Sequence, residues 1–436
     1  MQPSEDGPRA AGKRGAALRR STWPWILGLL ALAAGLRLAA MEQVAPYRLV
    51  GDEVYYVMVA THLAEGQGYL YRDSLGVESR ALRPPAHAAI LSLLVGGGRR
   101  PLLQLQVALG TLLVVLTACL ARTLFDARTG LAAGLIAALD PTLVAYSHYL
   151  WSETLFAVLV TAALIGVVRG GRAPGVGVAA LSGLLFGAAA LTREIAIPVA
   201  AACALWWATA APRGLRRRAA ARGALLLACA TLVVLPWSYR NYTVFGRVVP
   251  VATVGWFAAA EGNTLEGSSW LQVGPEARGE LIVEYSSRPD EMQRLDFARR
   301  YTLERIRAEQ PTWIFKKLVR TAVRLLGPDE SIGQKIRAGA YRDATPALAR
   351  AFLGASVLFD ALIVLAGIWG IAGARGRPRR LLPCLVLGVV VALHVVANAT
   401  SRFRMPWMPL LIAYASHALL NRPGLPGVRA PLSSEE

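Results

Sequence analysis

LVGDEVYYVMVATHLAEGQGY, residues 49–69, sets two adjacent carboxylates, Asp52 and Glu53, shortly after an apolar run at 23–41. A run of this length predicts a helix that crosses a bilayer, because a crossing takes about 20 mostly apolar residues. Charged side chains are costly in the hydrocarbon layer, so the pair belongs to a loop at its surface. The segment therefore predicts a membrane protein whose first loop carries an acidic pair.

The composition of the whole chain agrees with this prediction. Of the 436 residues, 55% are hydrophobic and only 17% are charged, against about 25% charged in soluble proteins. The net charge of +19 comes from arginines at the ends of apolar runs, where the positive-inside rule and anionic lipid headgroups account for them. We therefore expect no nucleic-acid partner. The four cysteines lie inside apolar runs without metal-ligand spacing, which excludes a disulfide framework.

Ten apolar runs are candidates for membrane spans. They are 23–41, 101–121, 129–145, 150–168, 176–191, 195–211, 223–239, 351–373, 381–398 and 405–420. The run at 84–98 is shorter and ends in glycines, so it fits either an eleventh span or a helix in the interface.

The positive-inside rule decides between these two options. If 84–98 does not cross and the basic N-terminal segment is cytoplasmic, the basic loops at 122–128, 169–172, 213–222 and 375–380 all fall inside. This pattern predicts ten spans in the cell membrane with both termini cytoplasmic. It also predicts that 84–98 is a juxtamembrane helix on the outer face, with Arg99 and Arg100 as the one local exception to the rule.

The same topology divides the chain into five parts. They are a disordered cytoplasmic tail at 1–22, a transmembrane core at 23–239 with its first outer loop at 42–100, an extracytoplasmic segment at 240–350, C-terminal transmembrane helices at 351–420, and a cytoplasmic tail at 421–436.

The extracytoplasmic segment shows two kinds of periodicity. The alternation in FGRVVPVATVGW, residues 245–256, predicts a strand, whereas 290–308 and 312–326 predict amphipathic helices. The segment is therefore expected to be α/β-like. Lys316, Lys317, Arg320 and Arg324 recur at helical spacing, which predicts that the second helix lies on lipid headgroups.

Several stretches in this order resemble a known family. They are GDEVYYVMVATHLAEGQGY, RPPAHAAILSLL, DPTLVAYSHYLWSETLF, GLLFGAAALTRE, LPWSYRN and RFRMPWMPLL. Together they resemble the bacterial family 39 glycosyltransferases of the GT-C superfamily, which include protein O-mannosyltransferase-like, aminoarabinose-transferase-like and RgtA/B/C/D-like enzymes. The resemblance implies an all-α polytopic membrane fold with about ten transmembrane helices. It also implies a polyprenyl-phosphate sugar as donor, an acceptor on the extracytoplasmic face, and an active site that contains the acidic pair.

The chemistry of such a transfer assigns roles to particular residue types. A base must take the proton of the acceptor hydroxyl, and we predict that Asp52 is this base. Glu53 beside it could raise the pKa of Asp52, hold the acceptor or coordinate a cation. The leaving group is a phosphate anion, which arginine binds well through two parallel hydrogen bonds. The predicted substrate-binding residues are Arg83, Glu153, Arg193, Arg240, Asn241, Tyr56, Arg402 and Arg404.

Several alternatives stay open from the sequence. No cofactor is certain, and a divalent cation, if one is used, would be held by Asp52, Glu53 and Glu153. An arginine at a helix end is also commonly an interfacial anchor. The chain could instead be a flippase or transporter of lipid-linked sugars, or a membrane partner that has lost its chemistry. The mid-span regions are almost uniformly Ala, Leu, Val and Gly, which argues against a transport pathway. The identities of the sugar and the acceptor are not specified by any motif.

Overall fold

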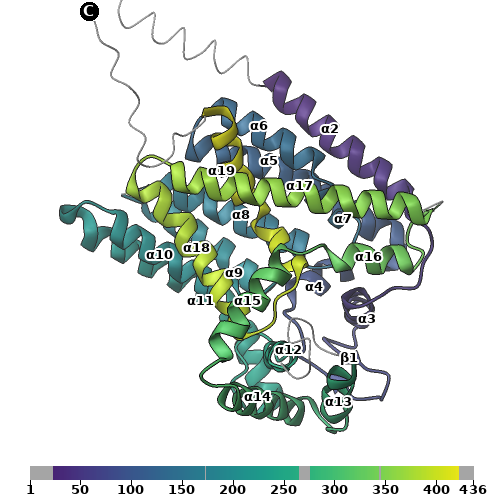
Figure 1. The fold of residues 1–436 in the computed structure, drawn as a ribbon. Helices are drawn as coiled ribbons and strands as arrows, with labels where there is room; N and C mark the ends of the chain where they lie inside the picture. The colour runs from purple at the N-terminus through teal and green to yellow at the C-terminus, as the bar shows by residue number, and fades with distance from the viewer. Residues whose placement is uncertain (1–22, 172, 265–274, 343–344, 422–436) are drawn as a thin grey trace, which may run out of the picture.

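The computed structural model describes residues 23–171, 173–264, 275–342 and 345–421. A bundle of long helices forms one layer, and shorter helices form a second layer beneath it (Figure 1). The predicted tails lie outside the described residues, apart from Asn421. The fold is all-α: the only sheet in the described part is one short hairpin, Tyr71–Arg72 with Glu78–Ser79 (β1 and β2).

Six helices of the described chain are long and apolar enough to cross a membrane. They are α2 (Trp23–Glu42), α5 (Arg99–Leu124), α8 (Glu153–Gly170), α11 (Arg216–Phe245), α17 (Pro346–Gly373) and α18 (Arg377–Val396). This makes the chain a multi-pass membrane protein, as its composition predicts.

The other four predicted spans also coincide with helices, but shorter ones. They are α6 (Ala127–Leu139) followed by α7 (Pro141–Tyr146), then α9 (Val176–Ala190), α10 (Ala196–Ala210) and α19 (Met408–Asn421). Asp140 ends α6 and caps α7 by accepting a hydrogen bond from the Leu143 amide at 3.0 Å. The count of ten crossings stays a prediction.

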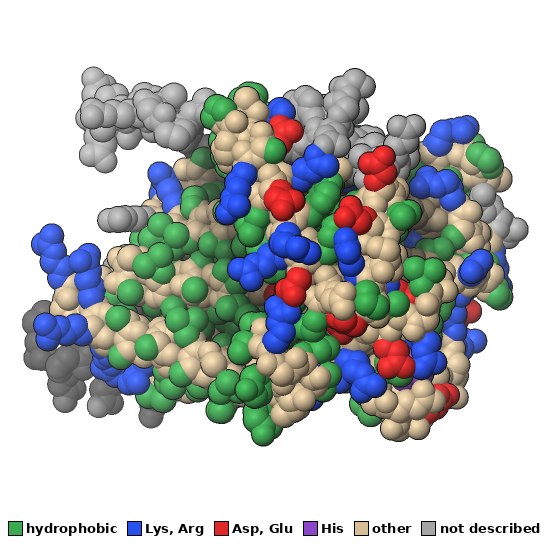
Figure 2. All heavy atoms as spheres, turned by 90° about the horizontal axis from the view of Figure 1, so that it is seen from below, with side chains coloured by type: hydrophobic (Ala, Val, Ile, Leu, Met, Phe, Trp, Pro, Cys, Tyr) green, Lys and Arg blue, Asp and Glu red, His purple; other side chains and the backbone are tan. Residues whose placement is uncertain are grey.

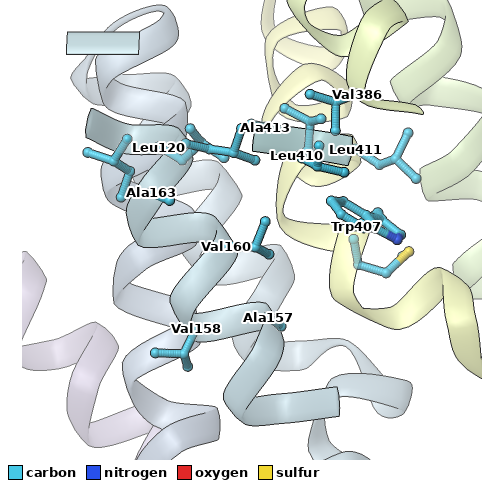
Figure 3. Close-up of a cluster of buried hydrophobic side chains, with 14 of the residues drawn as sticks. Leu120, Ala157, Val158, Val160, Ala163, Val386, Trp407, Leu410, Leu411 and Ala413 are labelled. Carbon is cyan, nitrogen blue, oxygen red and sulfur yellow. The ribbon is translucent and has the colours of Figure 1, made fainter. Parts of the chain in front are cut away.

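The hydrophobic core of the bundle lies between the N-terminal helices α5 and α8 and the C-terminal region. Side chains of α5 and α8, among them Leu120, Val160 and Ala163, face Trp407 and Leu410 from the C-terminal region (Figure 3). All five are almost completely buried. The last helix, α19, also packs against α5, α6 and α17, so the C-terminal helices are part of the same hydrophobic core as the N-terminal ones.

Small residues bring two of the helices into close contact. Gly183 and Gly187 lie one turn apart on α9, and α9 packs along α11. A β-carbon on Gly183 would come within 2.3 Å of the Leu226 carbonyl oxygen, and one on Gly187 within 2.7 Å of the Ala230 carbonyl oxygen. This is the small-xxx-small pattern that lets transmembrane backbones approach each other.

The first loop contains short helices next to the bundle. They are α3 (Asp52–Ala64), α4 (Ala86–Ser92) and the 3-10 turn η1 (Val95–Gly97). The run at 84–98 therefore forms a seven-residue helix and a turn, which are too short to cross a bilayer. This agrees with the choice made from the charge pattern.

The described residues of the segment at 240–350 form helices joined by loops and no strand of a sheet, so the predicted α/β-like segment is wrong. It contains α12 (Val254–Gly262), α13 (Pro275–Ser286), α14 (Glu291–Ala308), α15 (Trp313–Leu326) and α16 (Glu330–Arg337). The alternating stretch before α12 is a loop that forms no strand within the described residues. Side chains of α11 bond its carbonyls instead: Trp237 donates to Val251 O at 2.7 Å and Asn241 to Val249 O at 3.0 Å.

Both predicted amphipathic helices are present, but the second is oriented differently from the prediction. Lys317 and Arg320 of α15 are buried, whereas Phe315 on the apolar face is 68% exposed. Lys317 donates to the carbonyls of Gly262 and Ala397, at 2.7 and 2.8 Å, which lie at the C-terminal ends of α12 and α18. Helix C-termini need donors and favour cations. The lipid-headgroup prediction for these two residues is therefore wrong.

The second layer presents a mixed charged face. Seen from the side of α13 and α14, acidic and basic side chains gather together beside broad apolar areas (Figure 2). Asp296 of α14 forms an exposed ion pair with Arg247, at 2.8 Å. Ion pairs at the surface stay in contact with water and contribute little to the free energy of unfolding.

Candidate active site

Asp52 opens helix α3 at the edge of the bundle. Gly51 precedes it with a φ of 58°, a backbone conformation that residues other than glycine rarely adopt. The carboxylate lies in the first turn, where the helix dipole favours negative charge. The turn at Gly51 thus directs Asp52 toward the inside of the protein.

Two arginines from distant parts of the chain hold the Asp52 carboxylate. Arg83 Nη2 lies 2.6 Å from Oδ1, and Arg402 forms an ion pair with Oδ2. Burial opposes ionisation of Asp52, but Arg402 and Arg83 outweigh it and hold its pKa well below the usual range. Asp52 is therefore a carboxylate at neutral pH.

Glu153 extends this cluster through the same arginine. It begins α8 and is completely buried. Its Oε1 lies 2.7 Å from Arg402 Nη2 and 2.8 Å from Arg193 Nη1. The network consists of Arg83, Asp52, Arg402, Glu153 and Arg193 in this order. Three guanidinium groups face two carboxylates, so the network keeps one positive charge.

A cavity of about 560 Å³ opens beside this network. Its polar end is lined by Arg83, Arg193, Tyr56 and Ser152, and its apolar walls include Trp256, Leu393, Val396, Phe403 and Trp407. Tyr56 donates to Ser152 Oγ at 3.0 Å, and its ring lies under the Arg83 guanidinium. Nε of Arg83 and Nε of Arg402 are buried without a hydrogen-bond partner in the described part of the protein. The cavity can therefore accept an anion at one end and a hydrocarbon at the other.

Glu53 lies outside this cavity, although it follows Asp52 directly. Successive helical residues point about 100° apart, and Glu53 faces the protein interior. It forms a buried ion pair with Lys335 of α16, and it also accepts from the Tyr47 hydroxyl at 2.9 Å and the Leu150 amide at 3.1 Å. Burial lowers the pKa of Lys335 to about 8, although Glu53 acts in the opposite direction.

Three other predicted site residues contact backbone or distant side chains. Arg240 donates to Arg80 O at 2.6 Å and stacks over Trp237, and Asn241 holds the carbonyls of the extended stretch before α12. Arg404 pairs with Asp360 at 2.6 Å. The structure thus brings together Asp52, Arg83, Glu153, Arg193, Arg402 and Tyr56, and leaves Glu53, Arg240, Asn241 and Arg404 outside the cluster.

The chain matches one protein family over residues 81–239, that of the dolichyl-phosphate-mannose-protein mannosyltransferases. Among solved structures, it resembles the archaeal oligosaccharyltransferase AglB from Archaeoglobus fulgidus in complex with an inhibitory peptide and a dolichol-phosphate, with a TM-score of 0.57, 16% identity and coverage of 91% of this chain. The apo form of the A. fulgidus enzyme gives a TM-score of 0.53 with the same identity and coverage. The chain spans 50% of the length of each of these two structures.

The protein has the GT-C glycosyltransferase fold. ArnT from Cupriavidus metallidurans bound to undecaprenyl phosphate is a more distant structural match, with a TM-score of 0.43 and 15% identity over 92% of this chain and 78% of that one. No match is found among curated protein sequences. The two A. fulgidus structures confirm the fold that the sequence motifs imply. The matched region includes Arg83, Glu153 and Arg193 of the arginine network, while Asp52 and Arg402 lie outside it.

Glu194 is not among the predicted site residues, yet it lines the same cavity as Arg83 and Arg193. Its Oε1 accepts from the Ala252 amide at 2.8 Å, and no basic side chain pairs with it in the described residues. Burial raises its pKa to about 7. The signal that could have found it is its position directly after Arg193 in the stretch LTRE. Lys335, by contrast, carries no sequence signal that links it to Glu53.

The carboxylates at the site do not fit a divalent cation. Asp52 and Glu53 point to different surroundings, and Arg402 lies between Asp52 and Glu153. In the described residues, no three His, Cys, Asp or Glu side chains gather as metal ligands. A cation would have to displace a guanidinium group from oxygens that it already neutralises.

Proposed function

We propose that the protein transfers a sugar from a polyprenyl-phosphate donor to an acceptor on the extracytoplasmic side of the cell membrane. One observation carries this proposal: a partly buried network with one excess positive charge lies at the polar end of a cavity with apolar walls. This arrangement suits a lipid phosphate, whose headgroup is anionic and whose chain stays in the hydrocarbon layer. The dolichol-phosphate in the AglB structure is a ligand of this chemical class.

In the proposed reaction, the acceptor hydroxyl oxygen attacks the anomeric carbon of the sugar. The bond between that carbon and the phosphate oxygen breaks, and the polyprenyl phosphate leaves with its electron pair. Arg83, Arg402 and Arg193 stabilise the negative charge that develops on this leaving group. Asp52 takes the proton of the hydroxyl.

The low pKa of Asp52, which Arg402 and Arg83 cause, bears on this role. A phosphate that binds Arg83 and Arg402 competes with Asp52 for their hydrogen bonds. The pKa of Asp52 then rises toward the working pH, which makes it a better base once the donor is present. Donor binding and base activation are thus coupled through the same two arginines.

The transporter alternative predicts charged side chains along an open path through the spans. The charged residues found within the spans are instead engaged with protein. Arg37 of α2 is fully buried and donates to Ser147 Oγ and to three backbone carbonyls, and Asp360 of α17 pairs with Arg404. No observation favours transport over transfer.

The test is lipid analysis of a strain that lacks this protein. We expect a polyprenyl-phosphate sugar to accumulate and one glycosylated product to disappear. Both should return to normal with the wild-type chain but not with Asp52→Asn. A deletion strain with unchanged lipid-linked sugars and unchanged glycans would contradict the proposal.

A further inference from the structure

A second pocket, of about 580 Å³, lies at the junction of α2, α5 and the chain that follows α16. It is lined by four arginines, Arg48, Arg99, Arg100 and Arg342, and by a single carboxylate, Glu42. The C-terminal end of α2 lies near α3 and α16 at one side of the molecule (Figure 1). The pocket shares no lining residue with the cavity beside Asp52.

Most of the positive charge in this pocket is not neutralised. Glu42 pairs with Arg100 at 2.9 Å, and both side chains are more than half exposed. Within the described chain, no carboxylate pairs with Arg48, Arg99 or Arg342. The pocket therefore has an excess of about three positive charges from its own side chains.

Arg99 is held against Tyr47. Its guanidinium group stacks on the Tyr47 ring, 3.8 Å from the centroid, and Nη1 donates to Tyr47 O at 3.3 Å. Its Nε and Nη2 are buried and have no partner among the described residues. Buried donors in native proteins are almost always hydrogen-bonded. Two donors on one edge of a planar guanidinium group match two oxygens of a phosphate or carboxylate.

The charge pattern of the sequence points to the same place. Arg99 and Arg100, which directly precede a predicted span on the outer face, are the one local exception that the predicted topology leaves to the positive-inside rule. A binding role on that face gives a physical reason for such an exception.

We propose that this pocket binds the phosphate headgroup of a lipid. Arginines supply the headgroup contacts, while Met41, Val44 and Leu103, where α2 ends and α5 begins, offer an apolar surface for the adjoining part of the lipid. A phosphate carries the charge and the oxygens for several arginines at once. The lipid is either an anionic phospholipid or a phosphate-bearing glycolipid acceptor, which share this chemistry.

The site is separate from the donor site but physically connected to it. Tyr47 forms one wall of the pocket, and its hydroxyl donates to Glu53, the neighbour of Asp52 on α3. Lys335 donates to the same hydroxyl at 2.6 Å. A ligand on Arg99 is therefore two side chains away from the helix that carries Asp52.

The test measures binding of dioctanoyl phosphatidic acid to the full-length protein in a neutral detergent. We expect saturable binding to the wild type and an affinity at least 10-fold lower for Arg99→Gln. Arg99→Lys should have an intermediate affinity, because it keeps the charge but loses the two parallel hydrogen-bond donors. Dioctanoyl phosphatidylcholine should bind at least 10-fold more weakly than phosphatidic acid. Arg247→Gln, which removes an exposed arginine outside the pocket, should bind like the wild type. Arg48→Gln serves as a second pocket variant if Arg99→Gln does not fold.

The outcomes separate the two lipid sources and the two sites. Native mass spectrometry that finds a co-purified anionic phospholipid in the wild type but not in Arg99→Gln supports the site with phospholipid as its ligand. A raised KM for acceptor in Arg99→Gln at unchanged kcat supports it with the acceptor as ligand. Unchanged affinity in both pocket variants, equal binding of phosphatidylcholine, or displacement of the probe by polyprenyl phosphate would overturn the inference. The binding and mass-spectrometry results do not depend on whether the cavity beside Asp52 binds a donor, and only the KM for acceptor rests on the proposed function.

Discussion

Asp52 and Glu53 are adjacent in the chain but have different surroundings, and this difference assigns them different roles. Asp52 is held by two arginines, one of which, Arg83, lines the cavity. Glu53 is fully buried and held by Lys335 and Tyr47, so it joins α3 to α16. At the scale of single residues, we expect one carboxylate to act in chemistry and the other in stability.

Replacing Asp52 with Asn tests the first role. The amide keeps the shape of the side chain, so the fold and donor binding should persist, while transfer should fall ~10²–10⁴-fold, the usual contribution of a positioned base. The measurement is transfer of labelled sugar from polyprenyl phosphate in membranes with matched protein levels. Asp296→Asn, in an exposed ion pair, is the control and should keep full activity. Wild-type turnover by Asp52→Asn would remove Asp52 from the mechanism.

Arg402 should matter for stability as well as for binding, because it neutralises both Asp52 and Glu153. Arg402→Gln leaves these carboxylates to Arg83 and Arg193 alone, and loss of one partner in a buried ionic cluster typically costs about 3–5 kcal/mol. Thermal unfolding in detergent should therefore show a clearly lower Tm for Arg402→Gln and a smaller decrease for Arg402→Lys. An unchanged Tm for Arg402→Gln would mean that the cluster is not charged as described.

Glu194 should make stability depend on pH. Its pKa is raised to about 7, so the folded protein keeps a proton that the unfolded chain loses near pH 4.5. This contribution is complete below that pH and is lost as the pH rises through 7. Because the carboxyl borders an open cavity, we expect a loss on the order of 1–2 kcal/mol. Glu194→Gln should decrease the difference in Tm between pH 5 and pH 8, whereas Glu304→Gln, which removes an exposed carboxyl, should not. Equal differences in all three proteins would contradict the assignment.

At the scale of elements, the contact between α9 and α11 depends on two glycines, Gly183 and Gly187, whose lack of a side chain lets the helices approach. Gly183→Val would push a side chain against the Leu226 carbonyl, and overpacking of this kind costs about 1–3 kcal/mol or more. Gly177→Val on the same helix meets no atom within 4 Å, so it is a matched control with the same residue change. We expect a lower Tm and a lower yield of folded protein for Gly183→Val only. Similar losses in both variants would point to helix propensity rather than packing.

The elements also show what periodicity can and cannot predict. Asp290 and Thr312 precede α14 and α15 where the amphipathic pattern predicts helix starts. The pattern on α15 separates basic from apolar residues, but it does not say which face meets protein. Lys317 is buried because the ends of α12 and α18 leave carbonyls that need a donor. That requirement arises only when the three helices are already assembled.

At the scale of the whole molecule, membrane topology remains a testable prediction. In a chain whose native cysteines are replaced by alanine, Ser287→Cys and Ala221→Cys both introduce exposed thiols. A membrane-impermeant maleimide added outside intact cells should label the first and not the second, because we expect 240–350 outside and 213–222 inside. Labelling of Ala221→Cys in intact cells would contradict the predicted orientation, and detergent-opened cells control for reactivity.

The sequence predicts the whole fold better than it predicts the partners within the site. Apolar length located the helices, and the charge pattern correctly left 84–98 without a spanning helix, since these signals are local and repeated. Asp52, Arg83, Glu153 and Arg193 could be placed at one surface for the same reason. The Glu53–Lys335 pair could not be predicted, because one buried lysine in a short helix has no periodic signature. Arg402 and Arg404 look alike in the sequence, and only packing sends one to Asp52 and the other to Asp360.

The ion pair between Asp52 and Arg402 also has a consequence for how the protein is made. The two residues are 350 positions apart, so Asp52 is translated long before Arg402. During that interval, Asp52 in the first loop lacks Arg402, one of its two arginine partners. Only when the segment around η3 (Ser401–Trp407) has been translated and folded against α8 does Asp52 gain Arg402 as its second partner, and the network its one excess positive charge. Synthesis order thus makes completion of the proposed reaction centre one of the last steps of biogenesis, and we expect a nascent chain arrested before residue 402 to be inserted in the membrane yet inactive.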